Sequence, residues 1–411
     1  MSLRVAGVNV RAILDSRGRP TLEAVLALAS GAAGRASCPL AIAPGRRERP
    51  FTPLGGLDDG PAGVARAAAD QALAGRRFSG QESFDASLDA LTTAKSLRPD
   101  AMLALSLAFA RAAAQEAGRS LHHHLASLDG SDPALPRPLV NVFSGGVHAR
   151  RPARGVQQVM YVPERGGAVE DVEDALAVFA AAEERAGPVP LSASSGLLCG
   201  GDDAPETLLA RVVEAVHAAG RPRKAALLGV DVAAEHLWDG ARYCLGTTRV
   251  TGHELMARLE RLAADFPLVY LEDPFDARHT ALWRELTGRL SGRVLVAGDD
   301  LFATSARRVD PALAGAVVLK PSQAGTVSAT VAAARAARAA GMELCVSHRS
   351  GETDDPAICD LAVGLGARYL KLGGPRRGDR LAKYNQLLRL AEDPAVAPAA
   401  RPTSHDLAEA T

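Results

Sequence analysis

The chain has 411 residues, 47% of them hydrophobic and 23% charged, which is enough for one large or two ordinary globular domains. Lys and Arg total 47 and so do Asp and Glu, and the resulting net charge of +0 argues against a nucleic-acid binder. The longest apolar run, around 102–114, is too short to span a bilayer, and the start shows no secretory pattern. Five scattered cysteines without CxxC spacing favour a cytoplasmic protein over a disulfide scaffold.

Residues 1–130 are typical of a mixed α and β domain. The partly alternating stretches 5–14 and 21–28 flank DSRGRP, whose Gly and Pro predict a hairpin turn. Helical spacing of Ala and Leu follows over 64–73 and 101–125. The turn-rich stretch SLDGSDPALPRP then marks the expected domain boundary.

The chain from residue 131 to 395 has the pattern of a β/α barrel. Short apolar strands alternate with amphipathic helical stretches such as 206–219 and 326–340, which predicts βαβ units and a parallel sheet. About 260 residues of this pattern suit a closed barrel. The strand candidates are LVNVF, QQVMYV, ALLGVDV, LVYLED, RVLVAGDD, AVVLK, LCVSHR and YLKLGG. The last residues, 396–411, are predicted to be a disordered tail.

Successive predicted strands end in charged or polar side chains. A buried parallel strand ordinarily ends in turn residues, and barrel enzymes carry their catalytic groups at the carboxyl ends of the strands. A single charged residue at a strand end is explained equally well by solvation of that end or by a functional role. An unbroken series of such residues favours one shared functional site. The series is Asp231, Glu272, Asp299, Lys320, His348 with Arg349 and Ser350, and Lys371.

These residue types indicate metal-assisted removal of a proton next to a carboxylate. Asp231, Glu272 and Asp299 form an all-oxygen set that suits Mg²⁺ better than zinc. Positive charge and burial are expected to lower the pKa of Lys320 towards that of a useful base. Beside it, Arg349 is suited to a phosphate. Ser350 offers that phosphate a hydroxyl, and Lys371 offers a carboxylate a cation.

Six segments spread over residues 11–390 resemble enolase signatures. They are RAILDSRGRPTLEAVL, LEDPFD, GDDLFAT, LKPSQAGT, SHRSGET and LAKYNQLLRL. The resemblance implies an N-terminal α+β capping domain, a modified (β/α)₈ TIM barrel, a homodimer and Mg²⁺ dependence, and a lysine base beside Mg²⁺ is a known pairing in that superfamily. By position it makes Asp231, Glu272 and Asp299 the metal ligands, Lys320 the base, His148 and His348 the two active-site histidines, Arg349 and Ser350 the phosphate binders, and Lys371 the carboxylate binder.

Three segments depart from the enolase pattern, all on the side of the leaving hydroxyl. Where the family reads QEFM, this chain has Gln157 and then Gln158, so an amide replaces a catalytic glutamate while Gln157 is retained for substrate binding. The GDEGG loop becomes 193–197, where a gapless match puts Ser195 at the second glutamate; a gapped match would use Asp203, which more simply caps the next helix. The mobile SGAST loop becomes 40–44, with Ala43 in place of a metal-binding serine and Pro44 stiffening it.

Loss of both glutamates is expected to slow dehydration of 2-phosphoglycerate, because general acids contribute about 10²–10⁴ in rate. The sequence therefore predicts an enolase-like hydro-lyase acting on a more anionic phosphorylated or phosphonylated acid, such as a carboxyphosphonoglycerate in phosphinate biosynthesis. Six arginines near the two mobile loops would meet the extra charge, or simply form a solvated face: Arg46, Arg47, Arg49, Arg150, Arg151 and Arg154. An ordinary glycolytic enolase and a ligand-binding pseudoenzyme are the alternatives. The run 122–124 of three histidines is interpreted as helix surface rather than a metal site.

Overall fold

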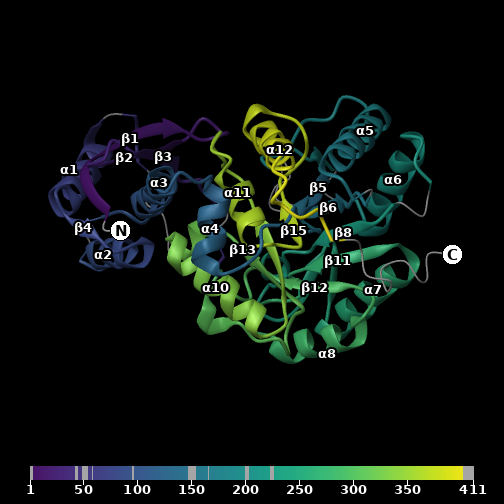
Figure 1. Ribbon diagram of the computed structural model, residues 1–411. Helices are drawn as coiled ribbons and strands as arrows, with labels where there is room; N and C mark the ends of the chain where they lie inside the picture. The colour runs from purple at the N-terminus through teal and green to yellow at the C-terminus, as the bar shows by residue number, and fades with distance from the viewer. Residues whose placement is uncertain are drawn as a thin grey trace.

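The structure is a computed structural model in which an N-terminal α+β unit lies beside a larger barrel (Figure 1). The N-terminal unit, purple to blue, forms one lobe, and the strands and helices of the barrel continue in teal, green and yellow. The residues described are 3–41, 45–48, 54–57, 59–94, 97–146, 154–164, 166–199, 203–222 and 226–400. The helices within these ranges include none that is long and apolar enough to cross a membrane.

The N-terminal unit is built on a four-stranded sheet in the order β3-β2-β1-β4. The strands are β1 (Leu3–Leu14), β2 (Pro20–Leu28), β3 (Ala33–Ser37) and β4 (Arg77–Phe78). The predicted hairpin is confirmed, since β1 and β2 pair in antiparallel register from Leu14 opposite Pro20. Asp15 closes the turn by accepting backbone N–H groups from Arg17 and Arg19 at 2.8 and 2.9 Å.

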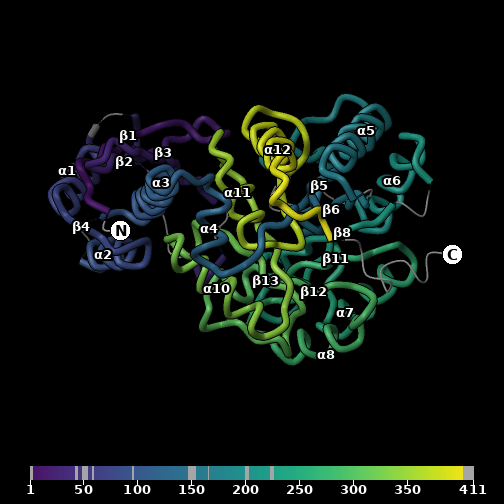
Figure 2. The backbone as a smooth tube through the Cα atoms, viewed as in Figure 1, coloured from purple at the N-terminus to yellow at the C-terminus, as the bar shows by residue number. Residues whose placement is uncertain are grey.

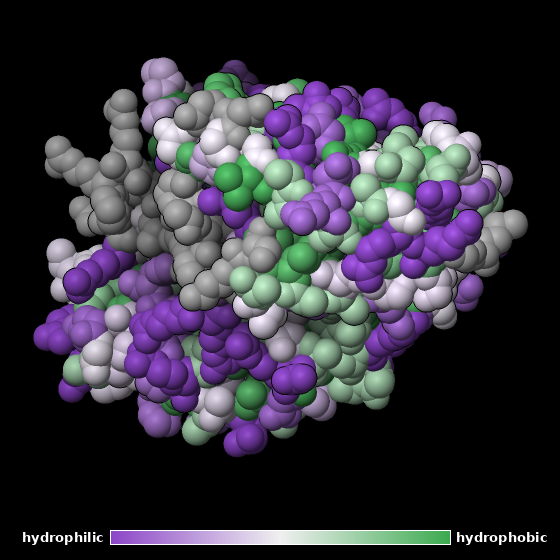
Figure 3. Space-filling model, turned by 90° about the vertical axis from the view of Figure 1, so that its left-hand side faces the viewer, coloured by the Kyte–Doolittle hydropathy of each residue, from purple (hydrophilic) through white to green (hydrophobic). Residues whose placement is uncertain are grey.

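In the described part of this unit the sheet is joined by four helices: α1 (Asp59–Leu73), α2 (Gln81–Thr93), α3 (Pro99–Glu116) and α4 (Leu121–Asp129). The stretch 101–125, for which helical spacing was noted, is divided between α3 and α4, because α3 ends before Gly118, whose φ of 63° lies in the left-handed region. Helix α3 packs directly on the sheet, where a Cβ on Gly34 would lie 2.0 Å from the Ala108 carbonyl oxygen. The outer face of the lobe mixes polar and apolar side chains (Figure 3).

The second unit is a closed barrel, which confirms the predicted TIM-barrel fold with an N-terminal cap. Its strands follow the order β15-β14-β13-β12-β11-β8-β6-β5, and pairing of β15 with β5 closes the ring. The path of the backbone through this unit is drawn in Figure 2. Among the described strands of the ring, the β5–β6 and β6–β8 pairs alone are antiparallel, which is the modification of the regular barrel. The strands are β5 (Arg137–Ser144), β6 (Gln158–Tyr161), β8 (Leu228–Asp231), β11 (Leu268–Glu272), β12 (Leu295–Gly298), β13 (Ala316–Leu319), β14 (Glu343–Ser347) and β15 (Tyr369–Lys371).

Helices cover the outside of the ring, and alternate strand residues fill its inside. Along β13, Ala316 and Val318 belong to a small separate core within the barrel, while Val317 and Leu319 pack outward against the main core. The longer helices are α5 (Ala168–Ala186), α6 (Pro205–Ala218), α7 (Gly252–Asp265), α8 (Thr280–Leu290), α10 (Val327–Ala339), α11 (Ala357–Gly364) and α12 (Gly378–Leu390). The shorter elements are β7 (Leu197–Leu198), β9 (Tyr243–Leu245), β10 (Thr248–Val250) and α9 (Pro321–Ala324).

Specific polar contacts join the two units. Arg111 of α3 forms a bidentate ion pair with Asp355 of the barrel, at 2.6 and 2.8 Å. The same carboxylate accepts the backbone N–H of Ser37 at 3.0 Å. Residues 396–400, which the sequence assigns to the tail, lie against the barrel: Val396 is buried, and Arg137 donates to the Ala400 carbonyl at 2.8 Å.

Candidate active site

The charged strand ends converge on one pocket at the carboxyl ends of the barrel strands. Parallel register explains the convergence, since Glu272 of β11 lies opposite Asp231 of β8. Of the residues predicted from the sequence, the pocket is lined by Gln157, Gln158, Asp231, Asp299, Lys320, His348, Arg349, Ser350 and Lys371. Glu272 lies just behind them, completely buried, and His148 lies outside the described residues.

Three buried carboxylates form the acidic centre of the pocket. Burial and the neighbouring Asp231 charge raise the pKa of Glu272 to about 7. Lys371 counters both groups, with its Nζ 3.0 Å from Asp231 and 2.8 Å from each Glu272 oxygen. Asp299 follows β12 and accepts from Gln323 at 2.9 Å. Buried carboxylate oxygens facing one another on adjacent strands are the donor set that Mg²⁺ prefers, so the residues fit this ion.

A second carboxylate cluster overlaps this centre and was missed in the sequence. Oxygens of Asp273, Asp299 and Asp300 lie within 4.8 Å of one another. Asp273 accepts the backbone N–H groups of Asp299 and Asp300, each at 2.9 Å, and so fixes the chain after β12. Burial and the Asp300 charge raise the pKa of Asp273 well above its ordinary value. The signal was available in LEDPFD, where Asp273 directly follows Glu272.

The expected base, Lys320, forms an ion pair with Asp299. The lowered pKa expected from the sequence was for an amine beside a bound metal ion, and it stays a prediction; for the protein residues alone the pKa of Lys320 is raised. Burial lowers the pKa of Lys320, while the neighbouring carboxylates, Asp299 first and then Glu272, raise it, and the net shift is upward. Lys320 can therefore accept a proton only when the negative charge of Asp299 is engaged elsewhere.

His348 is held neutral by an arginine that the sequence analysis did not single out. Arg380 of α12, fully buried, lies with Nη1 2.7 Å from His348 Nδ1. An arginine can only donate, so Nδ1 accepts and the neutral ring carries its proton on Nε2. Burial and the Arg380 charge keep the pKa of His348 well below its ordinary value. His348 thus presents a hydrogen-bond donor rather than an acid.

Arg349 is paired with Glu48, a second residue that sequence reasoning missed. Nη2 of Arg349 lies 2.7 Å from Glu48 Oε2, and the side chains are only 5% and 3% exposed. Glu48 also accepts from Gln323 at 3.1 Å, which carries the segment 45–48 onto the pocket. The Nη1 of Arg349 is buried without a hydrogen-bond partner among the described residues. One face of the guanidinium is therefore left for an anion.

The two positions expected to carry glutamates hold neutral side chains. Gln158 is buried at the pocket, opposite Asp231 in the β6–β8 register. In the loop before β7, Ser194 lines the pocket, whereas Ser195 is not among the described lining residues. Ser195 has a φ of 59°, which favours glycine, and its buried hydroxyl has no partner in the described chain. Of these two serines, Ser194 is therefore the one that faces the pocket, and the assignment of Ser195 to the second glutamate position stays a prediction.

Several of the residues singled out near the segments 40–44 and 148–154 have structural partners. Arg46 pairs with Glu235 at 3.2 Å, and Arg47 donates to the carbonyl oxygens of Leu301 and Ala277. Arg154 is exposed. Asp203 pairs with Arg211 of α6 at 3.2 Å, and the N-cap of that helix is Ala204, so the expected cap is wrong. The remaining arginines (49, 150 and 151), Ala43 and Pro44 lie outside the described residues.

The fold and the site define a class: a β/α-barrel protein whose strand ends bring carboxylates, lysines and an arginine to one pocket beneath an N-terminal cap. Two family models match this chain, "Enolase, N-terminal domain" over residues 5–125 and "Enolase, C-terminal TIM barrel domain" over residues 132–401. The chain is similar to the enolase of Anaplasma phagocytophilum (strain HZ), at 34% identity over 95% of both chains. It is 35% identical to the enolase of Acidothermus cellulolyticus over 95% of this chain and 94% of that one.

The chain therefore belongs to the enolase family, and the resemblance drawn from the sequence motifs is confirmed. At the level of the family, the prediction of a carbon–oxygen lyase of the hydro-lyase class is confirmed as well.

Proposed function

We propose that this protein is a Mg²⁺-dependent hydro-lyase that removes the α-proton of a 2-phosphoglycerate-type acid and eliminates water to give an enol phosphate or phosphonate. The observation that carries the proposal is the meeting of Lys320, three buried carboxylates and the half-free guanidinium of Arg349 in one pocket. A carbon acid of this kind needs a base, charge stabilisation for its carboxylate, and an anchor for its phosphoryl group. Each of these needs is met by a side chain at the pocket.

In this proposal Asp231, Glu272 and Asp299 hold the ion. Mg²⁺ supplies positive charge that stabilises the dianionic form of the substrate carboxylate. Engagement of the Asp299 charge leaves Lys320 free to accept the proton. Lys371, now shared between Asp231 and Glu272, would turn to the substrate carboxylate.

The phosphoryl group is assigned to the open face of Arg349 and to Ser350. Arg349 is buried, so a charge-assisted hydrogen bond to the anion is weakly screened there. Gln157, which donates to Asp231 at 3.3 Å, is assigned to substrate orientation. His348 and His148 are assigned to the substrate side of the pocket, with His348 contributing the Nε2 proton as a donor to the leaving hydroxyl.

The elimination half is proposed to differ from that of ordinary enolases. Gln158 and the serine at the second position, assigned from the sequence to Ser195 and from the pocket geometry to Ser194, lack the acidity of the two glutamates. We therefore propose an altered, more anionic substrate of the carboxyphosphonoglycerate type. The support is the loss of both acids; the arginines contribute less, because Arg46 and Arg47 have structural partners.

A paired assay tests this proposal. Enol formation is followed by ultraviolet absorbance with 2-phosphoglycerate and with a carboxyphosphono analogue, each with Mg²⁺ and with excess chelator. The proposal predicts Mg²⁺-dependent turnover that is much faster with the analogue. Faster turnover of 2-phosphoglycerate would favour the glycolytic alternative, and ligand binding without any turnover would favour the pseudoenzyme. A homodimer remains the expectation from the family and is checked by light scattering, and a cytoplasmic location remains the expectation from the scattered cysteines.

A further inference from the structure

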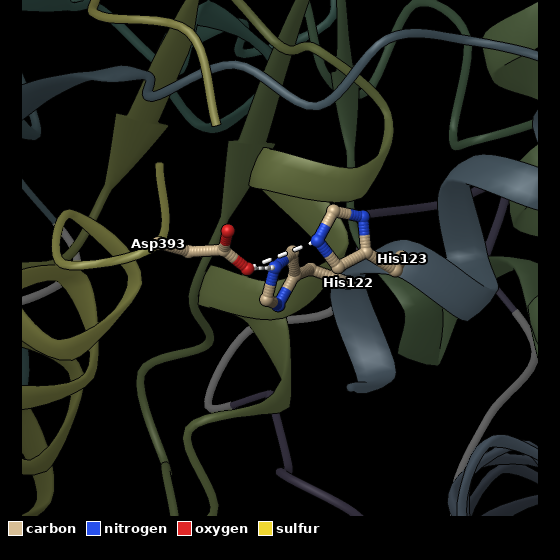
Figure 4. Close-up of side chains that lie close together, drawn as sticks. All are labelled: His122, His123 and Asp393. Carbon is tan, nitrogen blue, oxygen red and sulfur yellow. Dashed lines mark hydrogen bonds and ion pairs between the residues drawn. The ribbon is translucent and has the colours of Figure 1, made fainter. Parts of the chain in front are cut away.

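A second cluster of metal-ligand side chains lies away from the pocket, where the N-terminal unit meets the barrel. His122 and His123 on α4 both point toward Asp393, which follows α12 (Figure 4). Their Nε2 atoms lie 3.0 and 2.9 Å from the same oxygen, Asp393 Oδ2. The interpretation of this histidine run as helix surface is wrong for His122, which is 4% exposed.

The cluster is held in place from both sides. Helix α4 packs against α11, and the absence of a side chain at Gly364 lets the helices approach so closely that a Cβ there would lie 2.6 Å from the His122 carbonyl oxygen. Asp393 is fixed through its other oxygen, which accepts the Ala395 backbone N–H at 2.9 Å. The His122 backbone and the Asp393 carboxylate are therefore already held in position before an ion binds.

The second nitrogen of His122 completes a ligand arrangement. Its Nδ1 is buried and has no hydrogen-bond partner among the described residues, with Asp360 Oδ1 as the nearest carboxylate at 3.8 Å. Asp360 is itself held by Gln386 at 3.0 Å. A histidine that binds a metal through one nitrogen usually donates its other N–H to a carboxylate, and Asp360 is placed for this role.

We propose that His122, His123 and Asp393 form a site for a divalent transition-metal ion of the Zn²⁺ class that joins α4 to the end of the barrel. The two imidazoles and one carboxylate are the usual ligand types for such an ion. A tetrahedral ion with ligands about 2.1 Å away separates its ligand atoms by about 3.4 Å, so the present 2.9–3.0 Å contacts need only a small opening. His123 and Asp393 are 32% and 26% exposed, which gives the ion an entry path and leaves room for water as a fourth ligand.

The competing account of the same contacts is an ion-pair latch without metal. Burial by itself lowers the pKa of His122, but its contacts with Asp360 and Asp393 more than offset burial and the pKa is raised. A protonated His122 bridging two carboxylates would then hold the two units together. The metal site predicts that zinc binds to these residues, whereas the ion-pair latch predicts that it does not. Zinc binding therefore distinguishes the two accounts.

Isothermal titration with zinc chloride tests the site on the full chain, stripped with chelator and then saturated with Mg²⁺ so that the carboxylates of the pocket are occupied. We expect the Mg²⁺-saturated protein to bind one zinc ion per chain. Asp360→Asn should reduce the zinc affinity more than about tenfold, and His123→Ala and Asp393→Asn should reduce it further. His253→Ala is the matched control, since this exposed histidine of α7 also faces a carboxylate, Glu285, at 3.7 Å. It should bind zinc as the wild type does.

Thermal unfolding distinguishes lost binding from lost folding. Zinc should raise the Tm of the wild type and of His253→Ala but not of His123→Ala, while His123→Ala without zinc unfolds at nearly the wild-type temperature. Tetrahedral Co²⁺ absorption that disappears in Asp393→Asn would support the site. Unchanged zinc affinity in His123→Ala and Asp393→Asn, or no zinc bound by the wild type, would overturn it in favour of the latch.

Discussion

The buried pairing of Glu48 with Arg349 predicts that Glu48 opposes anion binding. The variant Glu48→Gln keeps the shape of the side chain and its contacts with neighbouring amide groups but removes its negative charge. Glu48 Oε2 is 2.7 Å from the guanidinium that we assign to the phosphoryl group. An anion at the open Nη1 of Arg349 therefore binds close to a second negative charge.

Two unit charges 4 Å apart interact by about 4 kcal/mol at an effective dielectric constant of 20. An anion on the far side of the guanidinium lies farther from Glu48, which reduces the repulsion to about 2 kcal/mol. Removing this repulsion should strengthen anion binding, but part of the gain in binding free energy is lost because Glu48 also orients Arg349. We therefore predict that Glu48→Gln binds phosphate or 2-phosphoglycerate about tenfold more tightly than the wild type, a change of about 1.4 kcal/mol.

Calorimetric titration with inorganic phosphate measures this change directly. The control is Glu235→Gln, which removes a buried carboxylate paired with Arg46 of the same segment but not with Arg349. Glu48→Gln should also lower the Tm without ligand, because Arg349 then lies buried and unpaired, and phosphate should restore it. Unchanged or weaker phosphate binding in Glu48→Gln, with Glu235→Gln at the wild-type value, would refute the competition.

Two further predictions concern the acid positions and the joint between the units. Gln158→Glu combined with Ser194→Glu should raise turnover of 2-phosphoglycerate by at least about tenfold, because general acids are restored at the pocket. Gln158→Glu with Ser195→Glu should raise it less, since Ser194 is the serine that lines the pocket, and equal gains in both double variants would contradict this preference. Arg111→Met should lower the free energy of unfolding by about 2–3 kcal/mol at pH 7 in urea titrations. Burial raises the pKa of Asp355, but Arg111 more than offsets burial and the pKa is lowered. The stabilisation is therefore present above the unfolded-state pKa of about 3.9 and disappears as the pH falls through the lower folded-state value; a difference that persists in acid would contradict this origin.

The barrel and most of the pocket could be predicted because their signals are local. A parallel strand ends at the same edge as its neighbours, so charged residues directly after apolar strands, such as Asp231 and Lys320, are brought together by the fold itself. The enolase motifs then added roles that spacing alone does not give.

The residues that were missed act across long sequence distances. Glu48 reaches Arg349, and Arg380 reaches His348, only after the cap and α12 have packed on the barrel. That Ser194 rather than Ser195 lines the pocket depends on the local backbone, including the positive φ of Ser195, which a comparison of sequences does not contain. The burial of His122 likewise depends on how α4 meets α11, since helical spacing alone does not say which face is covered.

We propose that Lys320 removes the α-proton with a divalent ion held by Asp231, Glu272 and Asp299. Nuclear magnetic resonance in D₂O tests it by following deuterium entering the C2 position of 2-phosphoglycerate, which reports proton removal even when loss of the hydroxyl is slow. We predict exchange by the wild-type protein with Mg²⁺, and none above background with excess chelator or in Lys320→Met. Exchange that persists in Lys320→Met, or that is indifferent to Mg²⁺, would contradict the claim.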